Sequence, residues 1–130
     1  MPARRVTGIG GIFFKASDPD ALRAWYRRHL GLDIQEWGGT VFHWDNPDPP
    51  GATVWSLFPA TSTYFAPSQA PFMINYRVAD LARVLGELRA EGCAVDEKTE
   101  ESEYGKFGWV MDPEGNRIEL WEPPPGRFPG

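Results

Sequence analysis

The sequence of 130 residues carries a formal net charge of -5 and no basic stripe, which argues against nucleic acid or an anionic membrane as a partner. Its composition, 42% hydrophobic and 14% aromatic, indicates one globular domain whose many rings line either a core or a ligand site. The single cysteine, Cys93, excludes an intramolecular disulfide, and no apolar run reaches the length of a signal-peptide core or a membrane span, so we expect a soluble, cytoplasmic protein.

A strand, a helix and three short strands are predicted in the first half of the chain. The strand covers residues 11–16, and the helix has its N-cap at Asp18, Pro19 at its first position and Gly31 at its end. Apolar side chains recur on one face of this helix. Three strand-like runs follow, separated by a Gly-Gly pair and by the turn-rich sequence DNPDPPG, at residues 33–39, 40–46 and 52–58.

The second half of the chain repeats this order after a Pro-, Ser- and Thr-rich segment, residues 59–71, that we interpret as a linker. A strand precedes a helix that opens at Asp80 and closes at Gly92, and three further strands follow it. Such a repeat predicts an α+β fold of two tandem βαβββ units. The two units pair to enclose a cup between their sheets, with the helices outside. They form a single domain over residues 1–130, with unit one at about 6–58, unit two at about 72–123 and a tail at 124–130.

Two sequence stretches carry a resemblance to a known family. The segments SDPDALRAWYRRHLGL and WVMDPEGNRIELWEP, in the context of the doubled pattern, resemble the vicinal oxygen chelate superfamily from about Val6 to Pro123. This superfamily includes glyoxalase I, bleomycin-resistance proteins, fosfomycin-resistance enzymes and extradiol dioxygenases. The resemblance implies a cup-shaped mixed β-sheet, whereas the reaction stays open because one scaffold hosts many chemistries.

The resemblance also implies up to four metal-ligand positions, a His on the first strand of each unit and a Glu or similar residue on the last. These positions fall on Gly11, Trp55, Met73 and Glu119. Only Glu119 is able to ligate, and one carboxylate holds a divalent ion weakly. His29 and His43 are expected to lie outside the cup. We therefore predict no metal and no cofactor, with a divalent metal as the disfavoured alternative.

Period-two alternation along the strands predicts the side chains that line the cup. The segment 100–108 has two glycines and is either a mobile lid or a plain solvated turn. As a lid it would bring Tyr104 or Lys106 to the ligand, so these two residues are added. The resulting lining is mostly aromatic, as in small-molecule sites, although the same rings would also fill a closed core. The predicted ligand-binding residues are Phe13, Phe42, Trp44, Trp55, Met73, Asn75, Arg77, Tyr104, Lys106, Phe107, Trp109, Met111 and Trp121.

Glu119 is the candidate catalytic residue. In an apolar cup its pKa rises, which suits a general base or a hydrogen-bond acceptor, unless Arg77 or Arg117 holds it ionised in a salt bridge. One hypothesis is therefore a glyoxalase- or bleomycin-resistance-like protein that binds a small aromatic or apolar molecule. The alternative is a lyase, isomerase or dioxygenase-like enzyme that uses Glu119 as a base or residual metal ligand. The resemblance further implies a homodimer, with or without exchange of units through the linker.

Overall fold

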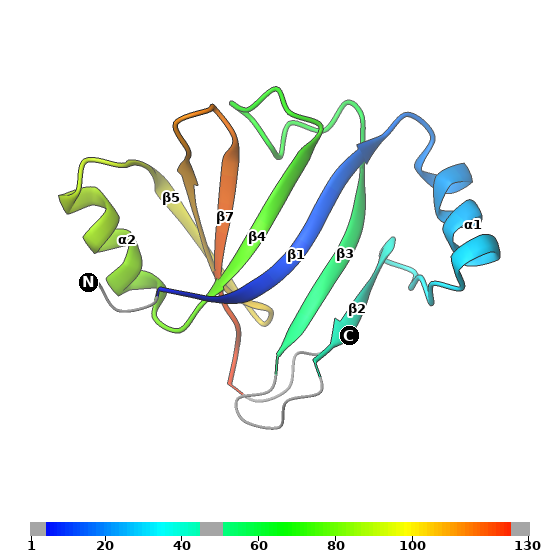
Figure 1. Ribbon diagram of the computed structural model, residues 1–130, viewed down its shortest axis with the longest axis horizontal. Coiled ribbons are helices and arrows are strands. Elements are labelled where there is room, and N and C mark those ends of the chain that lie inside the picture. Colours follow the sequence, from blue (N-terminus) through cyan, green and yellow to red (C-terminus); the bar gives the residue numbers. More distant parts are fainter. Residues whose placement is uncertain (1–4, 45–50, 126–130) are drawn as a thin grey trace.

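The computed structural model describes residues 5–44 and 51–125, which form a seven-stranded mixed sheet with two helices (Figure 1). The strand order is β2-β3-β1-β4-β7-β6-β5. The predicted α+β class and mixed sheet are confirmed. The elements are β1 Val6–Ala16, α1 Pro19–Leu30, β2 Gly39–His43, β3 Ala52–Pro59, β4 Phe72–Val78, α2 Leu81–Ala90, β5 Ala94–Ser102, β6 Gly105–Met111 and β7 Arg117–Glu122.

The two halves of the chain meet at the centre of the sheet, where β1 and β4 run antiparallel. In this pairing Gly11 lies opposite Asn75 and Phe13 lies opposite Met73. Each central strand also has a parallel partner, β3 beside β1 and β7 beside β4, so that Asn75 lies opposite Glu119. Because cross-strand partners point to the same face, this register gathers side chains from both halves on one side of the sheet.

The strand predicted at residues 33–39 does not form, apart from Gly39 at the start of β2, so the described part of the first unit is βαββ. Gly38 adopts a left-handed φ of 101°, and its N–H donates to the carbonyl of Gln35 at 3.0 Å. The Gln35 N–H in turn donates to the carbonyl of Gly39 at 2.8 Å. These hydrogen bonds hold the backbone in a turn, and glycine at position 38 tolerates the left-handed φ that the turn needs.

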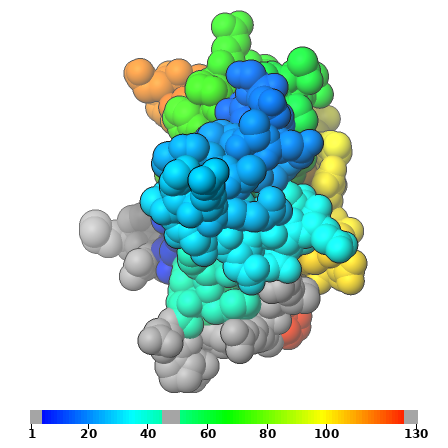
Figure 2. Space-filling view, turned by 90° about the vertical axis from the view of Figure 1, so that its right-hand side faces the viewer, coloured from blue at the N-terminus to red at the C-terminus, as the bar shows by residue number. Residues whose placement is uncertain are grey.

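Both helices begin at the predicted caps. The Asp18 carboxylate accepts a hydrogen bond from the Ala21 N–H at 3.1 Å, and Gly31 ends α1 with a φ of 68°. The outer surface of α1 spreads over one end of the molecule (Figure 2), and Trp25 and Leu30 on it are 49% and 59% exposed. No helix in the described ranges has the length and apolar character needed to cross a membrane.

The two faces of the sheet carry separate apolar clusters. Under α2, six buried side chains pack together, namely Val78, Leu81, Val84, Leu85, Val110 and Leu120. On the other face, Phe13, Met73 and Trp109 pack with Phe65, which is 0% exposed. Phe65 belongs to residues 60–71, the connecting segment between β3 and β4, so this segment contributes to the core as well as joining the units. The end of the predicted tail, residues 126–130, lies outside the described residues.

Candidate functional site

A cavity of about 630 Å³ opens on the face of the sheet that α2 leaves uncovered. Seven of the residues around it carry aromatic rings, so these rings surround open space instead of closing over it. We refer to this space as the cup. The lining residues are Gly10, Phe13, Trp37, Val54, Ser56, Phe58, Tyr64, Asn75, Glu103, Tyr104, Phe107, Glu119 and Trp121.

Glu119 lies at the floor of the cup with 1% of its surface exposed. One carboxylate oxygen, Oε1, accepts a hydrogen bond from the Asn75 side-chain amide at 2.7 Å. The other, Oε2, accepts from the Tyr64 hydroxyl at 2.5 Å and from the Trp109 indole N–H at 2.9 Å. Three donors from β4, β6 and the connecting segment therefore converge on one buried carboxylate, which we call the Glu119 network.

The predicted alternative of a salt bridge to Glu119 is wrong for the described residues. The Arg117 guanidinium donates to the carbonyl of Tyr64 and lies 3.5 Å from the Asp96 carboxylate. The Arg77 guanidinium stacks over the Trp44 ring, 5.3 Å from its centroid. Both arginines therefore lie close to the cup without pairing with its carboxylate.

Burial is the main influence on the protonation of this site. It raises the pKa of Glu119, while the hydrogen bonds from Tyr64, Asn75 and Trp109 and the charge of Arg117 act in the opposite direction. The pKa of Tyr64 is also raised, first by burial and then by the neighbouring Glu119 charge, so the phenol stays a hydrogen-bond donor. The floor of the cup thus holds a carboxylate that is easier to protonate than one in water.

We expect Tyr64→Phe to raise the pKa of Glu119 further, because the phenol hydrogen bond stabilises the ionised carboxylate. Loss of a hydrogen bond to a charged group should also lower the free energy of unfolding by about 1.5–3 kcal/mol. NMR titration of ¹³C-labelled glutamate side chains measures the first effect. Tyr26→Phe, on the outer helix α1, is the matched control, and an unchanged Glu119 titration in Tyr64→Phe would contradict the expectation.

Asn75 has one polar atom without a partner. It is 2% exposed, and its Oδ1 is the buried side-chain oxygen or nitrogen of the described residues that makes no hydrogen bond. This oxygen faces Gly10, where an added Cβ would lie only 2.1 Å away. A larger residue at position 10 would therefore displace the Asn75 side chain, and a hydrogen-bond acceptor remains unused beside the cup.

The structure places the predicted ligand-binding residues in three groups. Those that line the cup, with the candidate catalytic Glu119, are Phe13, Asn75, Tyr104, Phe107 and Trp121. Met73 and Trp109 lie directly beneath the lining, 0% and 1% exposed. Five others do not line the cup, namely Phe42, Trp44, Arg77, Lys106 and Met111, and Trp55 points to the opposite face.

The predicted orientation of Trp55 is wrong. Its ring packs against Tyr26 of α1, with centroids 4.9 Å apart, and against Phe14 at 5.6 Å. The parallel register sets Phe13 opposite Ser56, so the side chains of β3 that enter the cup are those of Val54, Ser56 and Phe58. The phase of β3 is therefore shifted by one residue from the prediction, which reverses the face of every side chain.

Strand pairing and side-chain contacts explain why the other five predicted residues do not line the cup. Phe42 lies opposite Thr53, which shares the Trp55 side of β3, and it is 50% exposed. Lys106 lies opposite Glu122, with its amino group 3.8 Å from that carboxylate, and alternates in direction with the cup-lining Phe107. Trp44 and Arg77 stack on each other, and Met111, opposite Arg117, lies at the end of β6 away from the lining.

Sequence reasoning missed several cup residues. Tyr64 is the most important, because it lies in the segment interpreted as a linker and bonds Glu119. An available signal was the adjacent pair Tyr64 and Phe65, since two large rings in a solvated linker would be unusual. Trp37 enters from the turn that replaced the predicted strand, and Glu103 from the turn between β5 and β6.

The four positions implied for metal ligands have other surroundings here. Gly11 has no side chain, and Met73 is enclosed in the apolar cluster. In the first unit Phe13 lies opposite Ser56, and in the second unit Asn75 lies opposite Glu119. Ser56 is therefore the counterpart of Glu119 and takes the position that the prediction assigned to Trp55. Within residues 5–44 and 51–125, no three His, Cys, Asp or Glu side chains are grouped to hold a metal ion. The histidines lie elsewhere, both of them exposed.

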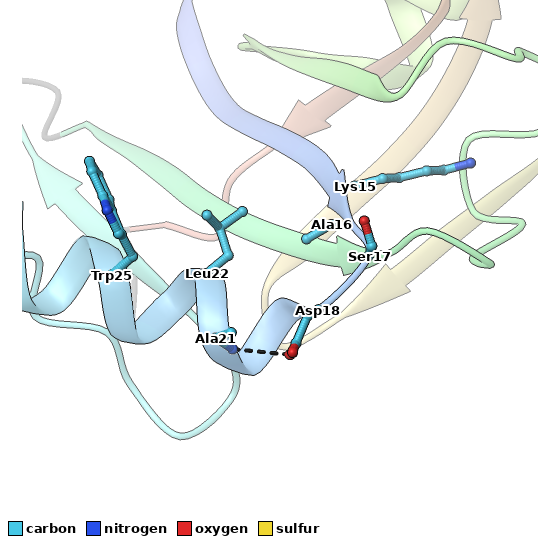
Figure 3. Close-up of a pocket in the computed structure, with 7 residues that line it drawn as sticks. All are labelled: Lys15, Ala16, Ser17, Asp18, Ala21, Leu22 and Trp25. Carbon is cyan, nitrogen blue, oxygen red and sulfur yellow. Dashed lines mark hydrogen bonds between the residues drawn. The ribbon is translucent and has the colours of Figure 1, made fainter.

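A second, more open cavity of about 440 Å³ lies between the end of β1 and the start of α1 (Figure 3). Its lining includes Ser17, Asp18 and Ala21, and the Asp18 carboxylate turns to the Ala21 N–H to cap the helix. The Asp18 carboxylate is thereby used in the fold, and the other charged lining residue, Lys15, places its amino group over the Phe65 ring. The cup is the stronger candidate for a site.

Comparison with known families agrees with this architecture. The profile of the glyoxalase-like domain matches residues 11–121. The chain belongs to this family. Among curated proteins, none matches the sequence significantly. The glyoxalase-like assignment places the protein in the vicinal oxygen chelate superfamily, as its sequence resemblance predicted.

Solved structures share the fold of this glyoxalase-like protein at low sequence identity. Methylmalonyl-CoA epimerase from Mycobacterium tuberculosis has a TM-score of 0.67 and 20% identity, covering 96% of this chain and 93% of its own. A methylmalonyl-CoA epimerase in complex with methylmalonyl-CoA and NH4+ has a TM-score of 0.70 and 19% identity, with coverages of 95% and 99%. A glyoxalase/bleomycin resistance protein/dioxygenase superfamily member from Vibrio splendidus 12B01 has a TM-score of 0.55 and 12% identity, and the match covers 88% of this chain and 97% of that one.

Proposed function

We propose that this glyoxalase-like protein binds a small, mainly apolar organic molecule in the cup. The observation that carries the proposal is a cavity of about 630 Å³ walled by aromatic rings, with a few polar groups at its floor. Small-molecule sites have this composition, because apolar burial supplies most of the binding free energy and a few polar contacts orient the ligand. Here the orienting groups are Ser56, Asn75 and Glu119.

We further propose that the cup works without a divalent metal. Its donor set does not suit one, because both Glu119 oxygens already accept hydrogen bonds and the companion positions hold Gly11, Ser56 and Met73. A hydroxyl and a buried thioether are weak ligands for a hard divalent ion. Metal analysis of the purified protein checks this: a stoichiometric metal that is lost in Glu119→Ala would refute it.

Binding is testable with the neutral fluorophore N-phenyl-1-naphthylamine. We expect saturable fluorescence enhancement with the wild-type protein, and about tenfold weaker binding in Trp37→Ala, since a lost aromatic contact of about 1.4 kcal/mol corresponds to that factor. Trp25→Ala is the matched control, because Trp25 and Trp37 are 49% and 51% exposed but only Trp37 lines the cup. Absence of saturable binding, or equal weakening in both variants, would contradict the proposal.

The second candidate is an enzyme in which Glu119 transfers a proton. It is favoured by the raised pKa of this carboxylate, because a raised pKa brings a buried carboxyl group closer to the range that suits general acid–base catalysis. Isomerase or lyase chemistry would meet that requirement. Chemical conversion of a bound compound by the wild-type protein, abolished in Glu119→Gln, would support catalysis over simple binding.

We also propose that the protein is a cytoplasmic homodimer. The dimer is supported by apolar surface outside the cup. Ile9 and Ile12 of β1 are 38% and 37% exposed, and Trp25 and Leu30 of α1 are exposed to a larger extent. Burying such surface against a second copy would be favourable. Sedimentation equilibrium should give twice the 14.6 kDa chain mass, whereas a monomer at micromolar concentration would rule it out.

A further inference from the structure

The charges around the cup are all of one sign. Glu103 at the rim and Glu119 at the floor are its charged lining residues, and no Lys, Arg or His of the described chain lines it. With a formal net charge of -5, the rest of the protein reinforces this negative field. An anionic ligand would therefore enter the cup without a cationic partner.

Arg117 and Lys15, two basic side chains close to the cup, are engaged elsewhere. The Arg117 guanidinium stacks on Trp109, 4.8 Å from the ring, and bonds to the Tyr64 carbonyl and to Asp96. Lys15 lies over the Phe65 ring, with its amino group 5.4 Å from the centroid. Arg117 acts on Glu119 through space but does not line the cup, so neither cation is placed to meet a ligand there.

Two polar atoms at the floor are available as acceptors only, and the Ser56 hydroxyl beside them is able to accept as well as donate. The buried Oδ1 of Asn75 has no partner, and Oε1 of Glu119 accepts one hydrogen bond where a carboxylate oxygen has room for two. The donors at this end, the Tyr64 hydroxyl and the Trp109 indole, are already directed at Glu119. A ligand group that donates N–H bonds would complement these acceptors.

The walls also suit a positive charge. Trp37, Tyr104, Phe107 and Trp121 line the cup, and Phe107 and Trp121 stack nearly parallel, with an interplanar angle of 13°. Aromatic faces attract cations through the negative potential of the ring, more strongly when water is excluded. Acidic groups, free acceptors and ring faces thus coincide in one cavity.

We propose that the cup selects organic ammonium ions with an aromatic body over neutral or anionic compounds of the same shape. This inference rests on the proposed function, since it names the class of molecule that the cup binds. An acyl-CoA ester, with its negatively charged phosphates, belongs to the class that the cup would reject.

The test is displacement of N-phenyl-1-naphthylamine at pH 7.5 by three naphthalene compounds that differ in charge: 1-naphthylmethylamine, 1-naphthylmethanol and 1-naphthylacetate. We expect the amine to displace the probe at a concentration about tenfold lower than the alcohol, and the acid to be weakest. Glu103→Gln, which changes an exposed rim residue, should reduce the preference for the amine about threefold. Glu114→Gln, in the turn before β7 and outside the lining, should leave it unchanged.

The outcomes separate the two proposals. If the probe binds but the alcohol or the acid displaces it as well as the amine does, the selectivity is refuted while the proposed function stands. An amine preference that survives in both Glu103→Gln and Glu119→Gln would also refute it, because the cup acids would then not be its source. If the probe does not bind at all, the proposed function fails, and this inference fails with it.

Discussion

Phe65→Ala will lower the free energy of unfolding by about 3–5 kcal/mol, the range for removing a phenylalanine ring from a packed core. Phe65 lies in the connecting segment, 0% exposed, with its ring centroid 5.0 Å from that of Phe58. It also packs in one cluster with Met73 and Trp109, directly under the cup. Its loss leaves a cavity that these neighbours close only in part, and urea-induced unfolding measures the difference.

Phe72→Ala is the matched control, since Phe72 begins β4 just beyond the connecting segment and is 40% exposed. We expect its effect to remain below about 1 kcal/mol, as for most partly exposed sites. The probe should also bind more weakly to Phe65→Ala, because the segment that carries Tyr64 loses its anchor. Equal destabilisation by both substitutions would show that the connecting segment is a simple linker after all.

This segment illustrates why the site was only partly predictable. Its Pro, Ser and Thr content correctly indicated the absence of helix and strand, and residues 60–71 contain neither. Composition carries no information about which face of a distant sheet such a segment covers. The bond from Tyr64 to Glu119 joins residues 55 positions apart and depends on the finished fold.

Features that depend on a few neighbouring residues, such as helix caps, were predicted more reliably from the sequence. Asp18, Asp80 and Gly31 hold the predicted positions, because a cap is decided by hydrogen bonds within one turn. Alternation also placed Phe107 and Trp121 correctly, and the DPEGNRIEL motif directed Glu119 to the cup. The phase of β3 was missed because only its pairing with β1 fixes that register, and the sequence does not contain this pairing.

The Glu119 network explains how a charged group is kept in an aromatic cup. An ionised carboxylate without partners is costly to bury, and three donors offset that cost here. Two donors, Asn75 and Trp109, come from the second unit, while Tyr64 comes from the connecting segment. The network therefore ties this segment to the sheet, and it should be coupled to both stability and pH.

Glu119→Gln will remove a pH dependence from the stability of the protein. Because the pKa of Glu119 is raised in the folded state, the folded protein binds more protons than the unfolded chain between the two pKa values. Wild-type stability gained from this group is present below the unfolded pKa and is lost as pH rises through the folded pKa. The loss amounts to about 1.4 kcal/mol for each unit by which the two pKa values differ.

The variant should therefore gain stability relative to wild type as pH increases from 4 to 8 in urea unfolding. Asp112 and Glu91, whose pKa values are lowered, give slopes of the opposite sign, but they are common to both proteins and cancel in the difference. Glu114→Gln, on the surface, is the control and should run parallel to wild type. A difference between Glu119→Gln and wild type that stays constant with pH would refute the prediction.

Glu119→Ala should behave differently from Glu119→Gln. A new amide keeps one oxygen for Tyr64 and Trp109, and its N–H₂ is able to donate to the unpaired Oδ1 of Asn75 once the Asn75 amide turns over. Alanine leaves all three buried donors without an acceptor, at about 1–3 kcal/mol each, so we expect a loss of about 3 kcal/mol or more at pH 7. If alanine were as stable as glutamine, the donors would not depend on this side chain, and the carboxylate would be held in the cup by its surroundings alone.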